Sequence, residues 1–181
     1  MIQTLKPGDI MEGGIKASAA EDNSYKASAY ISTPVGDSAG LVLAGSYNTT
    51  DGFYRNIFLG NRKVVDDQEV WSVDGRFVAQ LGDSTEVDIK ARYADLSGVD
   101  PAFFEDVNDH QFGYYSNIRP TNDQTTFETS VKLTHEFESA TLTAWALYSD
   151  VDQALTADGT SADFARYTFP GATPASVAAS N

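Results

Sequence analysis

The chain has 181 residues, no cysteine, and 26 acidic against 12 basic side chains, which gives a formal net charge of −14 at pH 7. So much negative charge repels phosphate backbones, so we expect no nucleic-acid partner. Without cysteine, disulfides and thiolate metal sites are excluded. The length suits one domain and equally allows a part of a larger protein.

The chain begins without an apolar run, so no signal peptide is visible, and no stretch is apolar and long enough for a membrane-spanning helix. Apolar and polar residues instead alternate with a period of two, which is typical of β-strands with one apolar face. Beyond 153 this alternation is lost, so we divide the chain into a sheet at 1–150 and a tail at 151–181. The alternation predicts seven strands, at residues 14–20, 25–33, 41–48, 70–80, 85–95, 125–137 and 140–150.

The predicted strands differ in how regularly apolar and polar residues alternate along them. Pro34 is expected to end the second strand, because proline cannot donate to a ladder. In the fifth strand Val87 and Ile89 alternate with charged residues, and in the sixth the apolar row runs from Phe127 to Phe137. The seventh has apolar residues on both faces, so its outward face stays open.

The short turns and the long loops are predicted to lie at opposite ends of the strands. The turns at 36–39, 82–85 and 138–141 share an acidic-Ser-small pattern, whereas 49–69 and 96–124 are long. In up-and-down order, the short turns share one edge and the long loops share the other, as in transmembrane β-barrels.

Strand length separates the two fold classes that produce such alternation. Several predicted strands are about ten residues long, near the roughly 9–11 that cross a bilayer at a tilt, whereas strands of soluble β-sandwiches average about 5–6. We therefore predict an all-β fold, an antiparallel up-and-down meander of about seven strands that is part of a large transmembrane β-barrel. Its lumen-facing residues are predicted to be Glu86, Asp88, Lys90, Arg92, Glu128, Lys132 and Glu136.

Apparent catalytic and metal motifs carry little weight. Residues 36–40 fit G-x-S-x-G around Ser38, but a nucleophile elbow needs a following helix, and the next residues alternate as a strand. The acidic segments 66–69 and 105–110 lack the spacing of a Ca²⁺ loop, and His135 sits on an apolar face. We expect no catalytic residue, no metal site, no cofactor and no enzymatic activity.

Two loop segments, 51–58 and 112–119, each combine three aromatic residues with one arginine. Rigid rings and directed guanidinium donors are typical of contact surfaces. A second interpretation stays open, in which these rings anchor the loops to themselves. The ligand-contact candidates are Phe53, Tyr54, Arg55, Tyr114, Tyr115 and Arg119.

A succession of short motifs resembles the N-terminal part of the β-barrel domain of TonB-dependent outer-membrane receptors, over residues 2–150. In that family an Asp-Gly-aromatic-aromatic segment follows the third barrel strand and opens an extracellular loop. The motifs are Lys6-Pro7, Glu12-Gly13, Ser24-Tyr25-Lys26, Asp51-Gly52-Phe53-Tyr54-Arg55-Asn56, and Ala140-Thr141-Leu142-Thr143 followed by Tyr148.

The resemblance implies a barrel of about 22 strands with a plug in its lumen. It implies a location in the bacterial outer membrane and the uptake of siderophore-bound iron, cobalamin or an oligosaccharide. The implied partners are outer-membrane lipid, a small nutrient ligand, TonB and the plug domain; the plug and the signal peptide would precede Met1, and further strands would follow Asn181. The alternative is a soluble β-sandwich or small barrel that binds carbohydrate through the same aromatic residues.

Overall fold

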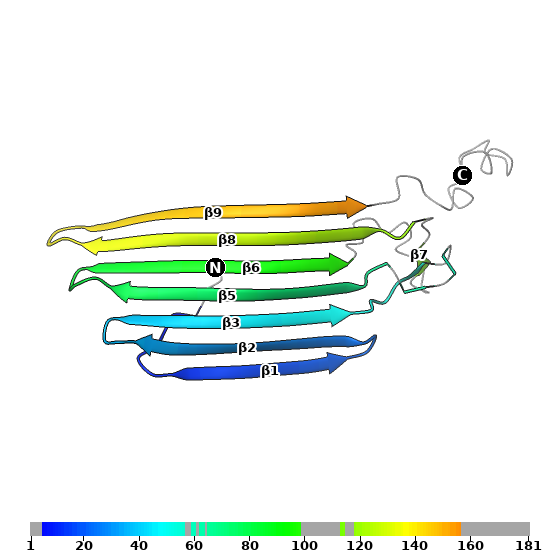
Figure 1. Ribbon diagram of the computed structural model, residues 1–181, viewed down its shortest axis with the longest axis horizontal. Coiled ribbons are helices and arrows are strands. Elements are labelled where there is room, and N and C mark those ends of the chain that lie inside the picture. The colour runs from blue at the N-terminus through cyan, green and yellow to red at the C-terminus, as the bar shows by residue number, and fades with distance from the viewer. Residues whose placement is uncertain are drawn as a thin grey trace.

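The computed structural model describes residues 5–56, 59–60, 62–63, 65–98, 113–114 and 118–156. Seven long strands form one antiparallel sheet in which each strand pairs with its neighbours along the chain, and Figure 1 shows them side by side in a single layer. The predicted all-β, seven-stranded meander is confirmed. The strands are β1 (Glu12–Ala20), β2 (Ser24–Val35), β3 (Ala39–Thr50), β5 (Gln68–Gln80), β6 (Thr85–Gly98), β8 (Thr121–Glu136) and β9 (Thr141–Thr156).

The connections divide between the two ends of the sheet as predicted. The turns between β2 and β3, β5 and β6, and β8 and β9 lie together at one end, which we call the turn end (Figure 1). The other end, the loop end, carries two further short strands, β4 (Arg55–Asn56) and β7 (Gly113–Tyr114). No helix in the described part of the chain could span a membrane.

Several predicted strand ends are wrong: β8 begins at Thr121 rather than at residue 125 and β6 ends at Gly98 rather than at residue 95, and the pairing explains two further cases. Pro34 lies inside β2, where it pairs with Gly40 of β3. β1 begins at Glu12, which lies opposite Ser32, so it does not reach Pro34. Pro34 therefore has a partner strand on one side alone, and proline is tolerated at such an edge. The seventh strand ends at Thr156 rather than at residue 150, so the first six residues of the predicted tail are strand. These six residues pair with the first residues of β8, from Thr121 onward, and this pairing keeps them in the strand although their apolar and polar residues alternate only weakly. The rest of the tail, 157–181, lies outside the described residues.

The register sorts the side chains onto two faces, because directly opposed residues point to the same side. Val73, Tyr93 and Phe127 share one row, on what we call the apolar face. The polar face contains the row of Asp74, Arg92 and Glu128. The register also settles β9, whose Leu142, Ala144 and Tyr148 lie on the apolar face and whose Trp145 and Leu147 lie on the polar face.

Burial on the two faces is inverted relative to a soluble sheet. In the described part of the chain, the buried hydrophobic side chains are Val42 and Val65 alone. The large side chains of the apolar face are instead exposed, for example 52% for Val73 and 45% for Val131. The buried polar or charged residues are Ser32, Asn56, Ser72, Arg76, Asp88 and Asn122.

A tight turn at the loop end joins β1 to β2. Asp22 and Asn23 both have positive φ, 58° and 50°, and the Ser24 N–H donates to the Glu21 carbonyl at 3.3 Å, so these two are the central residues of a β-turn that needs positive φ at both positions. The Asn23 amide donates to the Asp51 carboxylate at 2.6 Å, and the Asp51 N–H donates to the Asp22 carbonyl at 3.0 Å. The hairpin turn therefore holds the start of the loop that follows β3.

We predict that Asn23→Val lowers the free energy of unfolding by about 1–3 kcal/mol, because a β-branched residue is strained at positive φ. Asn23→Gly is the matched control, since it loses the same amide hydrogen bond without the backbone strain. Urea titration in detergent micelles measures both. Equal stability of the two variants would contradict the strained turn.

Candidate functional site

The two aromatic and arginine-rich segments meet at the loop end. Arg55 and Asn56 of β4 pair in parallel with Gly113 and Tyr114 of β7, although more than 50 residues separate them in the chain. Phe53 is 59% exposed and Arg55 is exposed, while Tyr54 is half-buried. For Tyr114 the backbone alone is described, and Tyr115 lies outside the described residues.

The segment that carries Phe53 and Tyr54 wraps around one carboxylate. Asp66 accepts hydrogen bonds from the backbone N–H groups of Phe53, at 2.8 Å, and Tyr54, at 2.9 Å. Gly52 makes this approach possible, because it adopts φ +74° and a Cβ at this position would collide with Asp66. Asp66 was not among the predicted site residues; its place after an apolar pair in a long loop gives no local signal for this contact.

The loop has its own small interior, built around Asn56 and Val65, both of which are fully buried. The Asn56 side chain accepts from the Leu59 N–H at 3.1 Å, and its backbone N–H donates to the Arg62 carbonyl at 2.7 Å. The anchors of this part of the loop are therefore an amide and an aliphatic side chain. The Phe53 ring, in contrast, points its surface to solvent.

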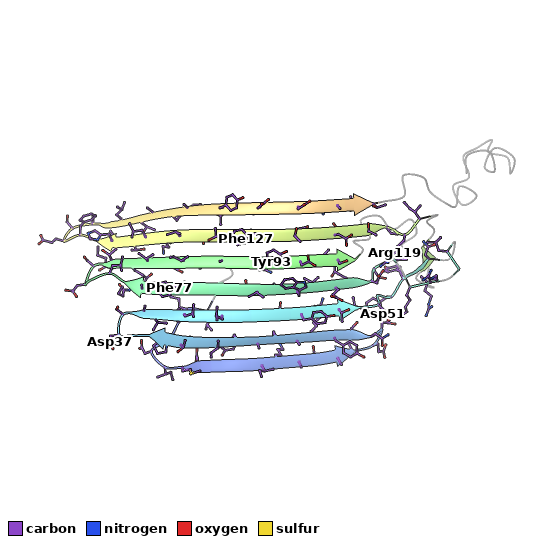
Figure 2. The ribbon with its side chains drawn as sticks, viewed as in Figure 1. Asp37, Asp51, Phe77, Tyr93, Arg119 and Phe127 are labelled. Carbon is purple, nitrogen blue, oxygen red and sulfur yellow. The ribbon has the colours of Figure 1, made fainter. Side chains whose placement is uncertain are left out.

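Charged pairs surround this loop. Arg119 forms an ion pair with Asp67, and Lys63 forms one with Asp22. Figure 2 places Arg119 and Asp51 at the loop end of the sheet, opposite Asp37 at the turn end. In the described part of the chain, no carboxylate pairs with Arg55. Arg55 is thus an exposed guanidinium two residues along the chain from the exposed Phe53 ring, whereas Arg119 pairs with Asp67.

The catalytic and metal motifs gain no support from the geometry. Ser38 lies in the turn between β2 and β3 and is followed by a strand, so the turn-to-helix step of a nucleophile elbow is missing at this serine. His135 lies on the apolar face, where its ring shares a hydrogen bond of 2.8 Å with the Thr85 hydroxyl. Within the described ranges, no group of three or more His, Asp or Glu side chains could hold a metal ion.

The polar face concentrates charge over β5, β6 and β8. The register places all seven residues predicted to face a lumen on this one face, with Asp88 opposite Lys132 and Arg92 opposite Glu128. At its centre the Arg76 guanidinium binds Asp88 through two parallel hydrogen bonds, Nε to Oδ1 at 3.0 Å and Nη2 to Oδ2 at 2.7 Å. Their side chains are only 10% and 6% exposed. The prediction did not include Arg76, although its alternation with the apolar side of β5 was a usable signal.

Residues 5–8 lie across this face as an inner strap. The Leu5 carbonyl accepts from Arg76 Nη1 at 2.9 Å, and Lys6 pairs with Glu86 at 3.3 Å. The Gly8 N–H donates to the Ser32 hydroxyl at 3.3 Å, and Pro7 occupies the space that a side chain at residue 40 would need. Glycine at that position therefore leaves room for the strap.

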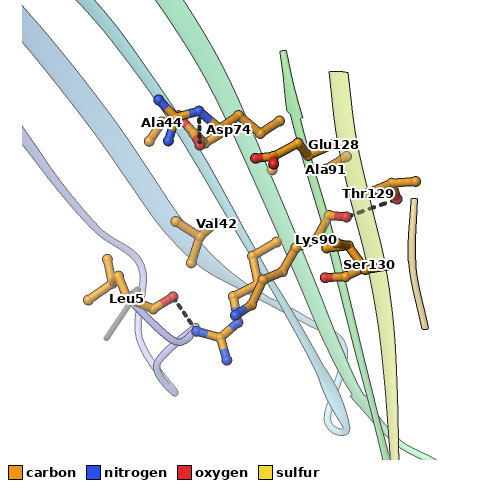
Figure 3. Close-up of a pocket in the computed structure, with 13 residues that line it drawn as sticks. Leu5, Val42, Ala44, Asp74, Lys90, Ala91, Glu128, Thr129 and Ser130 are labelled. Carbon is orange, nitrogen blue, oxygen red and sulfur yellow. Dashed lines mark hydrogen bonds and ion pairs between the residues drawn. The ribbon is translucent and has the colours of Figure 1, made fainter. Parts of the chain in front are cut away.

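A hollow of about 420 Å³ opens beside the strap (Figure 3). Leu5, Val42 and Ala44 form an apolar wall, and Lys90 and Glu128 contribute charge. Its charged rim includes the Arg92 and Asp74 pair at 3.7 Å, in which both side chains are about half exposed. The hollow is therefore amphipathic, and it lies on the face that the strap already covers in part.

No protein-family model and no curated protein matches the sequence. Among solved structures, the chain is similar to the siderophore receptor PirA from Pseudomonas aeruginosa, with a TM-score of 0.56 and 15% identity. The match covers 84% of this chain and 24% of that chain, so the chain spans about a quarter of the receptor's length. At this identity the likeness shows a shared fold, in which an antiparallel meander is consistent with a part of a barrel wall.

We predict that Gly52→Ala disrupts the loop, because the added Cβ collides with Asp66 at a backbone conformation that alanine resists. Gly60→Ala is the control, since Gly60 has a similar φ of +81° but open space around it. Limited proteolysis within 51–66 should rise strongly for Gly52→Ala and slightly for Gly60→Ala. Equal cleavage of the two variants would show that the Asp66 contact does not hold the loop.

We predict that Asp88→Ala lowers the free energy of unfolding by about 3–5 kcal/mol, because it leaves the buried Arg76 charge without its partner. Asp74→Ala breaks the exposed pair with Arg92 and should cost about 0–1 kcal/mol. Urea titration in detergent micelles compares them. A cost for Asp88→Ala as small as that for Asp74→Ala would show that the pair is solvated.

Proposed function

We propose that the chain is a part of the barrel wall of a bacterial outer-membrane receptor that takes up a small nutrient complex through the family's TonB-dependent mechanism. The nutrient would be siderophore-bound iron, cobalamin or an oligosaccharide. Lipid surrounds the wall, and the plug and the contact with TonB belong to other parts of the receptor. The fold shared with a siderophore receptor supports this proposal.

The inverted burial is the observation that carries the proposal. A soluble β-sandwich must cover its apolar face with a second layer, yet Val73, Ile89 and Val131 are between 38% and 52% exposed. A sheet face of exposed apolar side chains promotes aggregation of a protein in water, whereas the hydrocarbon of a membrane solvates such a face well. Outward apolar and inward polar residues are the arrangement of a transmembrane barrel strand.

The edges of the sheet fit a place within a larger barrel. β1 and β9 are the outer strands of the sheet, and each has one partner strand among the described residues. Unpaired backbone groups are costly in hydrocarbon, and a barrel removes them by closing. In the proposed receptor, further strands pair with both edges.

The loop end supplies the proposed ligand contacts. Phe53 and Arg55 are exposed next to each other on a loop whose anchors are Asp66, Asn56 and Val65. An exposed aromatic ring and an exposed guanidinium that pairs with no carboxylate among the described residues suit carboxylates, sugar hydroxyls and planar groups. This favours ligand contact over the alternative in which the Phe53 ring anchors the loop.

The environment of the sheet is tested by purifying the chain with and without detergent, followed by light scattering and far-UV circular dichroism. We expect β-structure in detergent and aggregation without it, because the apolar face has no protein cover. A monodisperse, cooperatively melting β-protein in plain buffer would overturn the receptor and favour the soluble carbohydrate-binding module.

The ligand contacts are tested in the complete receptor by titration with a ferric siderophore, cobalamin and a maltooligosaccharide. We expect one of these to bind, and Phe53→Ala and Arg55→Ala each to weaken it by about tenfold, as central contact residues do. Lys16→Ala on β1 is the control and should bind normally. Unchanged affinity in both loop variants would place the ligand elsewhere.

A further inference from the structure

Each of six neighbouring strands carries one aromatic residue on the apolar face near the loop end. All six rings are 37% to 57% exposed, and two pairs of them touch across strands, Trp71 with Tyr93 at 5.3 Å and Phe127 with Tyr148 at 6.4 Å between centroids. We call these six residues the aromatic line: Tyr25, Tyr47, Trp71, Tyr93, Phe127 and Tyr148.

The aromatic line crosses the strands obliquely. Tyr47 and Trp71 lie in one register row, and Tyr93 and Phe127 lie in a row two residues nearer the turn end. Tyr25 is two residues further toward the loop end, and Tyr148 is two residues further toward the turn end. The line therefore shifts by about six residues over five strand-to-strand steps, or about 20 Å along the strands for about 24 Å across them.

That shift defines an angle of about 40° between the line and the perpendicular to the strands, from the usual rise and strand spacing. Strands of membrane barrels tilt by about 35–45° from the barrel axis. A membrane border is perpendicular to that axis, so on an unrolled barrel it should also make about 35–45° with the perpendicular to the strands. Nothing in the pairing of neighbouring strands forces the aromatic residues onto such a diagonal.

On three of the six strands, a second border lies parallel to the first, at the turn end. On β2 it is Val35, and immediately after β5 and β8 it is Leu81 and Phe137, which are 46%, 59% and 56% exposed. Each stands ten positions along the chain after the aromatic residue of its own strand. Ten residues at this tilt span about 26 Å, close to the roughly 25 Å apolar band of membrane barrels.

The charged residues of the apolar face are distributed in relation to the aromatic line. No lysine or arginine of the seven long strands lies on the apolar face. The acidic residues of this face all lie beyond the line, between it and the loop end of their strands. They are Glu69, Asp95, Asp123, Asp150 and Asp152.

We propose that the aromatic line and its parallel border at the turn end are the two borders of the hydrocarbon layer, so that lipid acyl chains contact the tilted band between them. This rests on the proposed membrane receptor. Carboxylates are tolerated beyond the line because they reach headgroups and water, whereas charge inside the band would be strongly unfavourable.

The border has a consequence for the loop end. β6 continues five residues past Tyr93, and β9 continues eight past Tyr148. At a tilt near 40° the wall then rises about 13–20 Å above the hydrocarbon layer. β3, which leads into the loop with Phe53 and Arg55, ends only three residues past Tyr47, about 8 Å above the layer at the same tilt, so the wall is lower beneath this loop than at β6 and β9.

The border is tested with single cysteines introduced into this chain, which has none of its own, after any cysteine outside these 181 residues of the receptor is replaced by serine. The complete receptor, labelled with an environment-sensitive fluorophore, is reconstituted in phosphatidylcholine vesicles with brominated acyl chains. Ala29 and Asp150 lie in one register row, but Ala29 is inside the tilted band and Asp150 is beyond the line. We expect loss of fluorescence at Ala29→Cys and at Val131→Cys, and none at Asp150→Cys or at Ser130→Cys on the polar face.

The possible outcomes separate the border from the receptor itself. Equal quenching at Ala29→Cys and Asp150→Cys, with Val131→Cys also quenched, would overturn the tilted border but keep the membrane location. No quenching at any position would overturn the proposed receptor as well. The two tryptophans of this chain give a check without labels, because Trp71 lies on the aromatic line and Trp145 lies on the polar face. A variant with both replaced by phenylalanine measures the background from tryptophans elsewhere in the receptor, and this background is subtracted. Bromine should quench the Trp145→Phe variant, which retains Trp71, and spare Trp71→Phe.

Discussion

Backbone pairing between strands that are consecutive along the chain fixes the register, and the register decides everything else about the sheet. Because side chains alternate, one choice of register assigns every residue of seven strands to a face. A slip of β5 by one residue would carry Arg76 onto the apolar face, away from Asp88 on β6, and would carry Val73 onto the polar face. Because the two faces have opposite chemistry, this register is far more favourable than its neighbours wherever the two faces meet different surroundings.

The polar face shows how charge is made compatible with burial. Arg76 satisfies Asp88 through two hydrogen bonds and uses a third donor on the Leu5 carbonyl, so one guanidinium links two strands and the inner strap. Such a pair contributes little net stability over an apolar one but fixes geometry, because each partner is costly when left alone. The strap is therefore fixed to the sheet by hydrogen bonds and an ion pair.

At the loop end, the positions of the loop segments depend on a few specific contacts rather than on the alternation of apolar and polar residues. Asp66 organises the segment around Phe53, Gly52 makes room for it, and β4 and β7 bring two distant segments together. The aromatic line gives the same strands a second order, since the acidic residues of the apolar face all lie between it and the loop end. In the proposed receptor, ligand contact and membrane contact fall at different levels of the same strands.

Local pattern was enough to predict seven strands, their two faces at β6 and β8, and the division of short turns from long loops, because alternation and turn chemistry are encoded within about ten residues. Pairing between strands lies beyond that range. It decided the outward face of β9, the strand continuing through Pro34, and the extension of β9 to Thr156. The partnership of Arg76 with Asp88, the meeting of β4 with β7 and the oblique course of the aromatic residues likewise depend on register, which side chains distant in sequence select together.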